Sequence, residues 1–169
     1  MEITLNRAQI TDAALIHAMQ TAAFLPLYER YHDDETSPAK EPVGAVTARL
    51  MQPNTDYYIV HLDGEPVGAV RAVDHGTENG QRIYRISPLM ILPAYQNRGI
   101  GSRVMQLVLA KYPEADLWRL STILQEKGNC RLYEKCGFRQ TGKLTPLNEQ
   151  MTLVYYEKTV IHNGLHKTE

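Results

Sequence analysis

The chain has 169 residues, of which 43% are hydrophobic and 22% are charged, and its formal net charge is -1. This composition is ordinary for a folded globular protein and excludes the disordered and fibrous classes. The near-neutral charge gives no electrostatic reason to expect nucleic acid or an anionic membrane as a partner. The length fits a single core, so residues 1–169 are expected to form one domain.

The sequence gives no sign of secretion or membrane insertion. No apolar run approaches the roughly 18 residues of a membrane-spanning helix, and residues 1–10 lack the charged-then-apolar order of a signal peptide. Cys130 and Cys136 lie six positions apart on one predicted helix, which puts them on opposite faces and argues against a bond between them. Because reduced thiols fit a reducing compartment, we expect a cytoplasmic protein.

The first third of the chain is predicted to be mainly helical. A strand at Ile3–Leu5 precedes Thr11, which is expected to cap a helix with apolar positions at helical spacing: Ala14, Leu15, Ala18, Met19, Ala22 and Ala23. A weaker helical stretch, Leu27–Tyr31, leads into the polar loop His32–Pro38. A further helix is expected over Val43–Met51, with Pro42 near its first turn.

After residue 54 the pattern changes to strands. Two strands, Tyr57–Leu62 and Pro66–Val73, flank a hairpin turn at Asp63-Gly64-Glu65. A polar turn at His75–Gln81 precedes a long strand, Arg82–Leu92, which Pro93 closes. The remaining elements are expected to be helix, strand, helix and two strands: Gly99–Lys111, Trp118–Leu124, Gly128–Cys136, Phe138 onward, and Met151–Glu157. This order predicts an α/β (α+β) fold in which helices pack on a mixed sheet.

The most informative segment is Leu89–Ser102, where a strand ends and two glycines, Gly99 and Gly101, open an amphipathic helix. Glycine lets the backbone approach a ligand closely. The first turn of a helix presents unpaired N–H groups and the positive end of its dipole, which together bind phosphate. Since Arg98 adds a full positive charge, the segment predicts a phosphate-binding turn.

Two nucleotide-binding motifs fit this segment poorly, and a purely structural turn is a further alternative. A P-loop requires Gly-Lys-Ser/Thr, whereas the sequence has Gly101-Ser102-Arg103. A dinucleotide fingerprint requires a small residue at Val104 and an acidic residue about 20 positions further on. Glu114 and Asp116 lie only near that distance.

Two blocks of the sequence resemble a known family. Gln96-Asn97-Arg98-Gly99-Ile100-Gly101 resembles the Gln/Arg-x-x-Gly-x-Gly/Ala signature of the GNAT superfamily of N-acetyltransferases, and residues 132–138 resemble its Leu-Tyr-x-x-x-Gly-Phe block. The resemblance implies a GNAT-like mixed, mostly antiparallel sheet with helices on both faces. It also implies an enzyme that transfers an acetyl group from acetyl-CoA to the primary amine of a small molecule or peptide, without a metal.

The same resemblance implies which residues bind the cofactor. Main-chain groups of Leu89, Met90 and Ile91 would hydrogen-bond the pantetheine arm along the strand edge. The turn and the start of the helix would hold the pyrophosphate: Gln96, Asn97, Arg98, Gly99, Ile100, Gly101 and Ser102. Lys135 would either reach the nucleotide phosphates or be a solvated charge on its helix.

Tyr133 resembles the general acid of the family. A phenol with a reference pKa of about 10 is protonated at neutral pH and can protonate a leaving thiolate. The alternative is a structural tyrosine that stacks between helix and strand. Asn129 lies one helical turn before Tyr133, on the same face, where it could bind the cofactor arm. Many family members instead carry an asparagine seven residues before the tyrosine, where this sequence has Glu126.

The two carboxylates that family members use as general base are missing, because Arg85 and Ser121 stand at those positions. Proximity in sequence makes Asp74, His75 and Glu78 candidates. A water chain, or an acceptor amine of low pKa, would need no dedicated base. The missing carboxylates also leave a second function open, namely a catalytically silent CoA-binding sensor or scaffold.

The stretch His32-Asp33-Asp34-Glu35 is not expected to bind a metal, because adjacent side chains do not point at one ion. It is expected to form a mobile acidic loop. Such a loop often borders the acceptor pocket in the family, so it would favour a cationic acceptor. The C-terminal strand at Met151–Tyr156 could pair with a second copy, which makes a homodimer one option.

Overall fold

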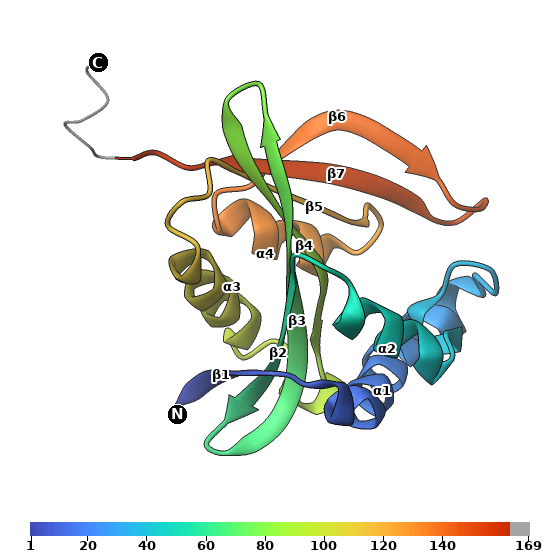
Figure 1. Cartoon of the computed structure of the whole chain (residues 1–169). Helices are drawn as coiled ribbons and strands as arrows, with labels where there is room; N and C mark the ends of the chain where they lie inside the picture. Colours follow the sequence, from blue (N-terminus) through green and yellow to red (C-terminus); the bar gives the residue numbers. More distant parts are fainter. Residues whose placement is uncertain (163–169) are drawn as a thin grey trace.

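The computed structural model describes residues 1–162 and contains a seven-stranded sheet with helices on both faces (Figure 1). The strands follow the order β1-β2-β3-β4-β5-β7-β6, and all neighbours are antiparallel except the parallel pair β4 and β5. The predicted fold class is therefore confirmed. In chain order the elements are β1 (Ile3–Arg7), α1 (Ala13–Tyr31), α2 (Val43–Met51), β2 (Thr55–Leu62), β3 (Glu65–Glu78), β4 (Gln81–Ile91), α3 (Ile100–Lys111), β5 (Leu117–Ile123), α4 (Lys127–Lys135), β6 (Arg139–Pro146) and β7 (Thr152–Thr159).

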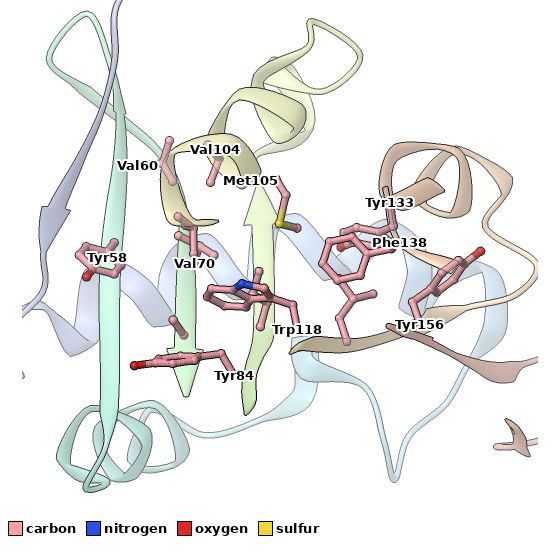
Figure 2. Close-up of a cluster of buried hydrophobic side chains, with 14 of the residues drawn as sticks. Tyr58, Val60, Val70, Tyr84, Val104, Met105, Trp118, Tyr133, Phe138 and Tyr156 are labelled. Atoms are coloured by element: carbon pink, nitrogen blue, oxygen red, sulfur yellow. The ribbon is translucent and has the colours of Figure 1, made fainter. Parts of the chain in front are cut away.

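Each face of the sheet has its own core. Helices α1 and α2 cover one face, where Ile16 and Val46 pack against strand residues such as Tyr57. Helices α3 and α4 cover the other face, over a larger cluster that contains Trp118 (Figure 2). The ring of Tyr84 lies 5.1 Å from that of Trp118, centroid to centroid. In the described part of the chain, no helix combines the length and apolar character needed to cross a bilayer.

The first helix differs from the prediction in its start, its length and its buried face. It begins after Asp12 rather than Thr11, because the Asp12 carboxylate accepts the Gln9 N–H and a short 3-10 turn, Ile10–Asp12, forms first. It also runs without a break through Pro26, which lies on the exposed side. The buried positions are Ala13, Ile16, Met19, Gln20 and Ala23, so of the predicted apolar face only Met19 and Ala23 are buried.

A buried glutamine explains the shift of that face. Gln20 is 1% exposed, and its Nε2 donates to the Pro38 carbonyl and to Glu41 Oε1. A polar side chain of this kind can be buried because its donor group is hydrogen-bonded. Hydrophobic periodicity alone does not identify such a position.

Two predictions about strands also change. The expected polar turn at His75–Gln81 is mostly strand, because β3 continues to Glu78 and only Asn79-Gly80 forms the turn, with both residues at positive φ. The idea that Met151–Tyr156 offers a free pairing edge is wrong, since β7 lies between β5 and β6 and is hydrogen-bonded to both. The outer strands of the sheet are β1 and β6.

Several other predictions are confirmed. The hairpin turn forms at Asp63-Gly64, and α2 begins directly after Pro42. The helix that follows the glycine segment covers Ile100–Lys111. Cys130 and Cys136 are both free thiols.

Strands β4 and β5 run side by side over three residues only. Residues 83–85 pair with residues 117–119, and no pairing between these two strands follows within the described chain. On its other side β4 stays paired with β3 as far as Ile91. The two parallel strands therefore separate toward their carboxyl ends, and β4 has no strand partner along Leu89–Ile91 on the side of the gap.

A bulge in β4 marks the point of separation. Val70 pairs with Leu89 and Ala72 with Ile86, so Ser87 and Pro88 together oppose the single residue Arg71. Proline has no N–H to donate to a ladder, and a bulge bends the strand that carries it. The Arg71 side chain supports the bend, because its Nε donates to the Ser87 carbonyl at 2.5 Å.

Close backbone contact between β3 and β4 yields a first prediction. A Cβ atom on Gly68 would lie 2.2 Å from the Met90 carbonyl oxygen, whereas one on Gly44 in α2 would meet nothing within 4 Å. Gly68→Ala is therefore expected to lower the free energy of unfolding by about 2–3 kcal/mol, because the backbone must move. Gly44→Ala is the matched control and is expected to be neutral or to stabilise by up to about 1 kcal/mol. Urea unfolding of both variants is the measurement, and equal stabilities would contradict the prediction.

Candidate functional site

Two cavities meet in the gap between β4 and β5. The first, about 440 Å³, runs along the free edge of β4 to the turn before α3 and is called here the turn groove. The second, about 370 Å³, lies between β4, β5 and the loop after α1 and is called here the apolar cavity. The two cavities share part of their lining, which consists of Phe24, Leu27, Leu89, Asn129 and Tyr133.

The structure brings almost all of the predicted site residues to the turn groove. Its lining includes Leu89, Met90, Ile91, Gln96, Asn97, Gly99, Ile100, Gly101, Ser102, Asn129 and Tyr133. Arg98 is the exception: it is exposed, and its guanidinium lies over the Tyr95 ring, 5.5 Å from the centroid. The charge of Arg98 therefore lies beside the groove and does not line it.

The turn between Asn97 and Ser102 presents a row of free amides. Asn97 and Gly99 have φ values of 62° and 79°, the left-handed backbone that arranges successive N–H groups around a concave site. The first hydrogen-bonded amide of α3 is that of Arg103, which donates to the Gly99 carbonyl at 3.2 Å. Among the described residues, the amides of 97–102 have no hydrogen-bond acceptor. The turn is therefore built to bind an anion.

Glycine and glutamine shape the walls of this turn. A Cβ atom on Gly101 would lie 3.2 Å from Leu132 Cδ2, so glycine lets the start of α3 lie close to α4. Gln96 Nε2 donates to the Ile91 carbonyl at 2.8 Å. This bond satisfies one of the carbonyls that β4 presents at its free edge and ties the turn to the strand.

Tyr133 lies on α4 where the two cavities join. Its ring packs against those of Phe138 and Tyr156, with centroid distances of 6.2 and 6.3 Å (Figure 2). The residue is 8% exposed, and its hydroxyl has no hydrogen-bond partner within residues 1–162. Burial raises the pKa of Tyr133, and the nearby thiols of Cys136 and Cys130 raise it further. The phenol is therefore protonated at neutral pH, and Tyr133 lines both cavities.

Asn129 and Glu126 occupy the start of α4. Asn129 borders both cavities together with Tyr133, as their spacing on one helix face predicts. Glu126, which stands where many family members carry asparagine, accepts from Arg30 Nη1 at 2.5 Å and from the Tyr31 hydroxyl at 2.6 Å. These bonds join the end of α1 to the start of α4 across the gap.

None of the three proposed bases lines either cavity. Asp74 forms an ion pair with Arg82, which lowers the pKa of Asp74. Glu78 forms an ion pair with Arg119, with 3.6 Å between Glu78 Oε2 and Arg119 Nη1. His75 lines a separate cavity that contains Arg119, and burial followed by two arginines, Arg85 and Arg119, lowers the pKa of His75. The structure therefore does not bring these side chains to Tyr133.

The residues at the two usual base positions contact each other. Arg85 Nη2 donates to Ser121 Oγ at 3.0 Å. Ser121 lines the apolar cavity, while Arg85 lines the separate cavity that contains His75. The part of the chain that the structure describes contains no group of three or more His, Cys, Asp or Glu residues placed to bind a metal.

Sequence reasoning missed several lining residues. Phe24 and Leu27 of α1 border both cavities, and their three-residue spacing was the available signal. Lys158 of β7, which no motif marks, lines a cavity of about 380 Å³ beside Ser102 together with the predicted candidate Lys135. Asp33, assigned to a mobile acidic loop, is instead 8% exposed and lines the apolar cavity.

The comparisons with known proteins agree with this geometry. The sequence matches the acetyltransferase (GNAT) family over residues 16–138, and the chain belongs to that family. A curated relative, the uncharacterized protein YrkN of Bacillus subtilis (strain 168), is 29% identical over 123 residues. That alignment covers 71% of this chain, and the chain spans 63% of the length of the relative.

Solved structures show the same fold. An acetyltransferase from Thermus thermophilus superposes with a TM-score of 0.72 at 18% identity, covering 95% of this chain and 98% of the other. AAC(6')-Ib in complex with ribostamycin and coenzyme A superposes with a TM-score of 0.69 at 20% identity, covering 94% of both chains. At such identities the similarity establishes the fold alone.

Proposed function

We propose that residues 1–169 form a single N-acetyltransferase domain that transfers an acetyl group from acetyl-CoA to the primary amine of a small-molecule or peptide acceptor. The observation that carries the proposal is one continuous path. It leads from the free amides of residues 97–102, along the unpaired edge of β4, to the Tyr133 hydroxyl. An anion-binding turn, a strand edge and a buried acid, in that order, match a phosphate, an amide-containing arm and a thioester.

Each part of acetyl-CoA would contact chemically suited groups in or beside the turn groove. The free amides of the turn would hold the diphosphate, while Lys135 and Lys158, beside Ser102, supply positive charge for a further phosphate. The pantetheine amides would hydrogen-bond Leu89–Ile91, because the backbone there has no strand partner on the side of the gap. Asn129, which borders the groove next to Tyr133, would bind the end of that arm.

In the proposed transfer step, Tyr133 acts as the proton donor. The neutral amine attacks the thioester carbonyl carbon, a C–N bond forms, and the C–S bond breaks as the tetrahedral intermediate collapses. Tyr133 donates its proton to the departing thiolate, and the proton that the nitrogen releases restores the phenol. Because burial raises the pKa of Tyr133, the acid is present in its protonated form throughout the neutral range.

Thiol release tests the activity. Purified protein is mixed with acetyl-CoA and a panel of primary amines, and free CoA thiol is followed over time. Release that requires an amine, with N-acetylated product seen by mass spectrometry, is the expected result. Tight CoA binding without release for any amine would favour a silent CoA-binding module, an alternative that the missing carboxylates at Arg85 and Ser121 support.

The free amides of the turn generate a prediction about cofactor affinity. Gly99 and Gly64 both have positive φ, and a Cβ atom on either would meet nothing within 4 Å. Each Gly→Ala variant should therefore lose about 1–2 kcal/mol of stability from backbone strain alone. Only Gly99→Ala should also weaken CoA binding, by about tenfold, the equivalent of one charge-assisted hydrogen bond. Calorimetric titration with CoA decides, and equal affinities in the two variants would contradict the placement of the diphosphate.

The proposed acid generates a prediction about rate. Tyr133→Phe should lower kcat by about 10²–10³-fold while leaving the Kd for CoA within about twofold, because only the transfer of a proton is lost. Tyr155→Phe removes a hydroxyl that bonds Thr145 outside both cavities and is the control, with activity near that of the wild type. A Tyr133→Phe enzyme with unchanged kcat would exclude the role.

The pH dependence adds a second check on Tyr133. Because the pKa of this phenol is raised above its ordinary value of about 10, its acidic proton is retained on the alkaline side. The kcat of the wild type should therefore not fall between about pH 8 and 9.5. A fall in that range that Tyr133→Phe abolishes would show a lowered pKa and would contradict the structure.

A further inference from the structure

The apolar cavity contains a carboxylate whose charge the protein leaves unpaired. Asp33 follows α1, is 8% exposed and lines this cavity. Its Oδ2 accepts from Thr36 Oγ1 at 3.0 Å, whereas Oδ1 is buried and has no hydrogen-bond partner among the described residues. Within residues 1–162, no lysine, arginine or histidine forms an ion pair with Asp33.

The position of Asp33 is fixed by the backbone around it. Its carbonyl accepts the N–H groups of Thr36 and Ser37, at 3.1 and 2.8 Å. The two acids that follow in sequence are placed differently. Asp34 is exposed and accepts from the Tyr28 hydroxyl, and Glu35 is exposed. Of these three consecutive acids, Asp33 alone reaches the cavity.

An unpaired buried carboxylate oxygen is costly. A buried polar group without a partner destabilises the protein, and it does so more strongly when the group is charged. A cationic donor removes that cost, because it supplies both the missing hydrogen bond and the opposite charge. Hydroxyl groups such as that of Ser37 also line this cavity, but most of its accessible wall is apolar and includes Leu27 and Leu153. A ligand suited to this cavity therefore carries a positive charge on an apolar body.

The charge held at Asp33 cannot be on the nitrogen that attacks. A nearby carboxylate favours the protonated form of an amine, whereas attack on the thioester requires the neutral form. The acceptor that fits this site therefore carries two basic groups. One is held as a cation at Asp33, and the other reacts beside Tyr133, which lines the same cavity.

We propose that the acceptor is a diamine, or an amine with a distal cationic group, whose second cation binds Asp33 and whose connecting body is apolar. This inference rests on the proposed function, since it assigns the apolar cavity to the acceptor. Asp33 is the residue that determines specificity for the second charge.

Matched acceptors of equal length test the proposal in the wild-type protein. The series pairs α,ω-diaminoalkanes of four to eight carbons with the amino alcohols in which a hydroxyl replaces one amine. At the best chain length, the diamine should have a KM at least tenfold below that of the amino alcohol, with kcat within about threefold. A difference below twofold at every length would overturn the assignment.

A pair of variants ties the preference to one carboxylate. Asp33→Asn keeps an acceptor for Thr36 but removes the charge, and it should reduce the ratio of the two KM values to within about twofold. Glu35→Gln removes a neighbouring exposed charge and should keep the wild-type ratio. Preservation of the ratio in Asp33→Asn, or its equal loss in Glu35→Gln, would contradict the proposal. If Asp33→Asn does not fold, the wild-type series still decides.

The failure of this inference can be distinguished from the failure of the proposed function. If no amine releases CoA thiol, the same acceptor pairs are titrated calorimetrically into the complex with CoA. A tenfold difference in Kd would then support the Asp33 site although the transferase activity is absent. Thiol release with equal KM values for diamine and amino alcohol would support the transferase activity and contradict the role of Asp33.

Discussion

The separation of β4 from β5 is the constraint on which the rest of this structure depends. Two parallel strands that start as neighbours would normally stay paired, because unpaired backbone groups inside a protein are costly. Here the ladder stops after residue 85, where Ser87 and Pro88 form a bulge in β4. The opened edge is left to the Gln96 side chain and to the turn groove. Without the gap, the anion-binding turn and Tyr133 would have no path between them.

The same gap explains why helix α1 covers the site. An opening in the middle of a sheet exposes apolar side chains of both layers, and α1 covers them with Phe24 and Leu27. The bonds of Glu126 to Arg30 and Tyr31 fix the end of α1 over the opening. A covered site excludes water, and burial raises the pKa of the Tyr133 phenol. The gap in the sheet, the helix that covers it and the buried Tyr133 at the junction of the cavities therefore depend on one another.

Much of this could be predicted from sequence, because the signals are local. The segment around Gly99 identified the turn, and the spacing of Asn129 and Tyr133 placed both on one helix face, as the structure shows. The features that the sequence does not predict depend on tertiary packing. Pro88 lies inside one long predicted strand, and although a proline signals an interrupted ladder, the sequence does not show that β5 is the neighbour lost there. Likewise, three consecutive acids look alike in sequence, and only the packing of the loop after α1 buries Asp33.

The two ends of the site carry opposite electrostatic character. The free amides of residues 97–102, with Lys135 and Lys158 nearby, make one end attractive to anions. Asp33 makes the other end attractive to cations. Tyr133, held neutral by its burial, lies where the two cavities join and opposes neither charge. Complementary fields of this kind steer each partner to its own end before close contact forms. In the proposed reaction, a neutral Tyr133 at the junction would let an uncharged nitrogen meet the thioester, which is the one step that no fixed charge should disturb.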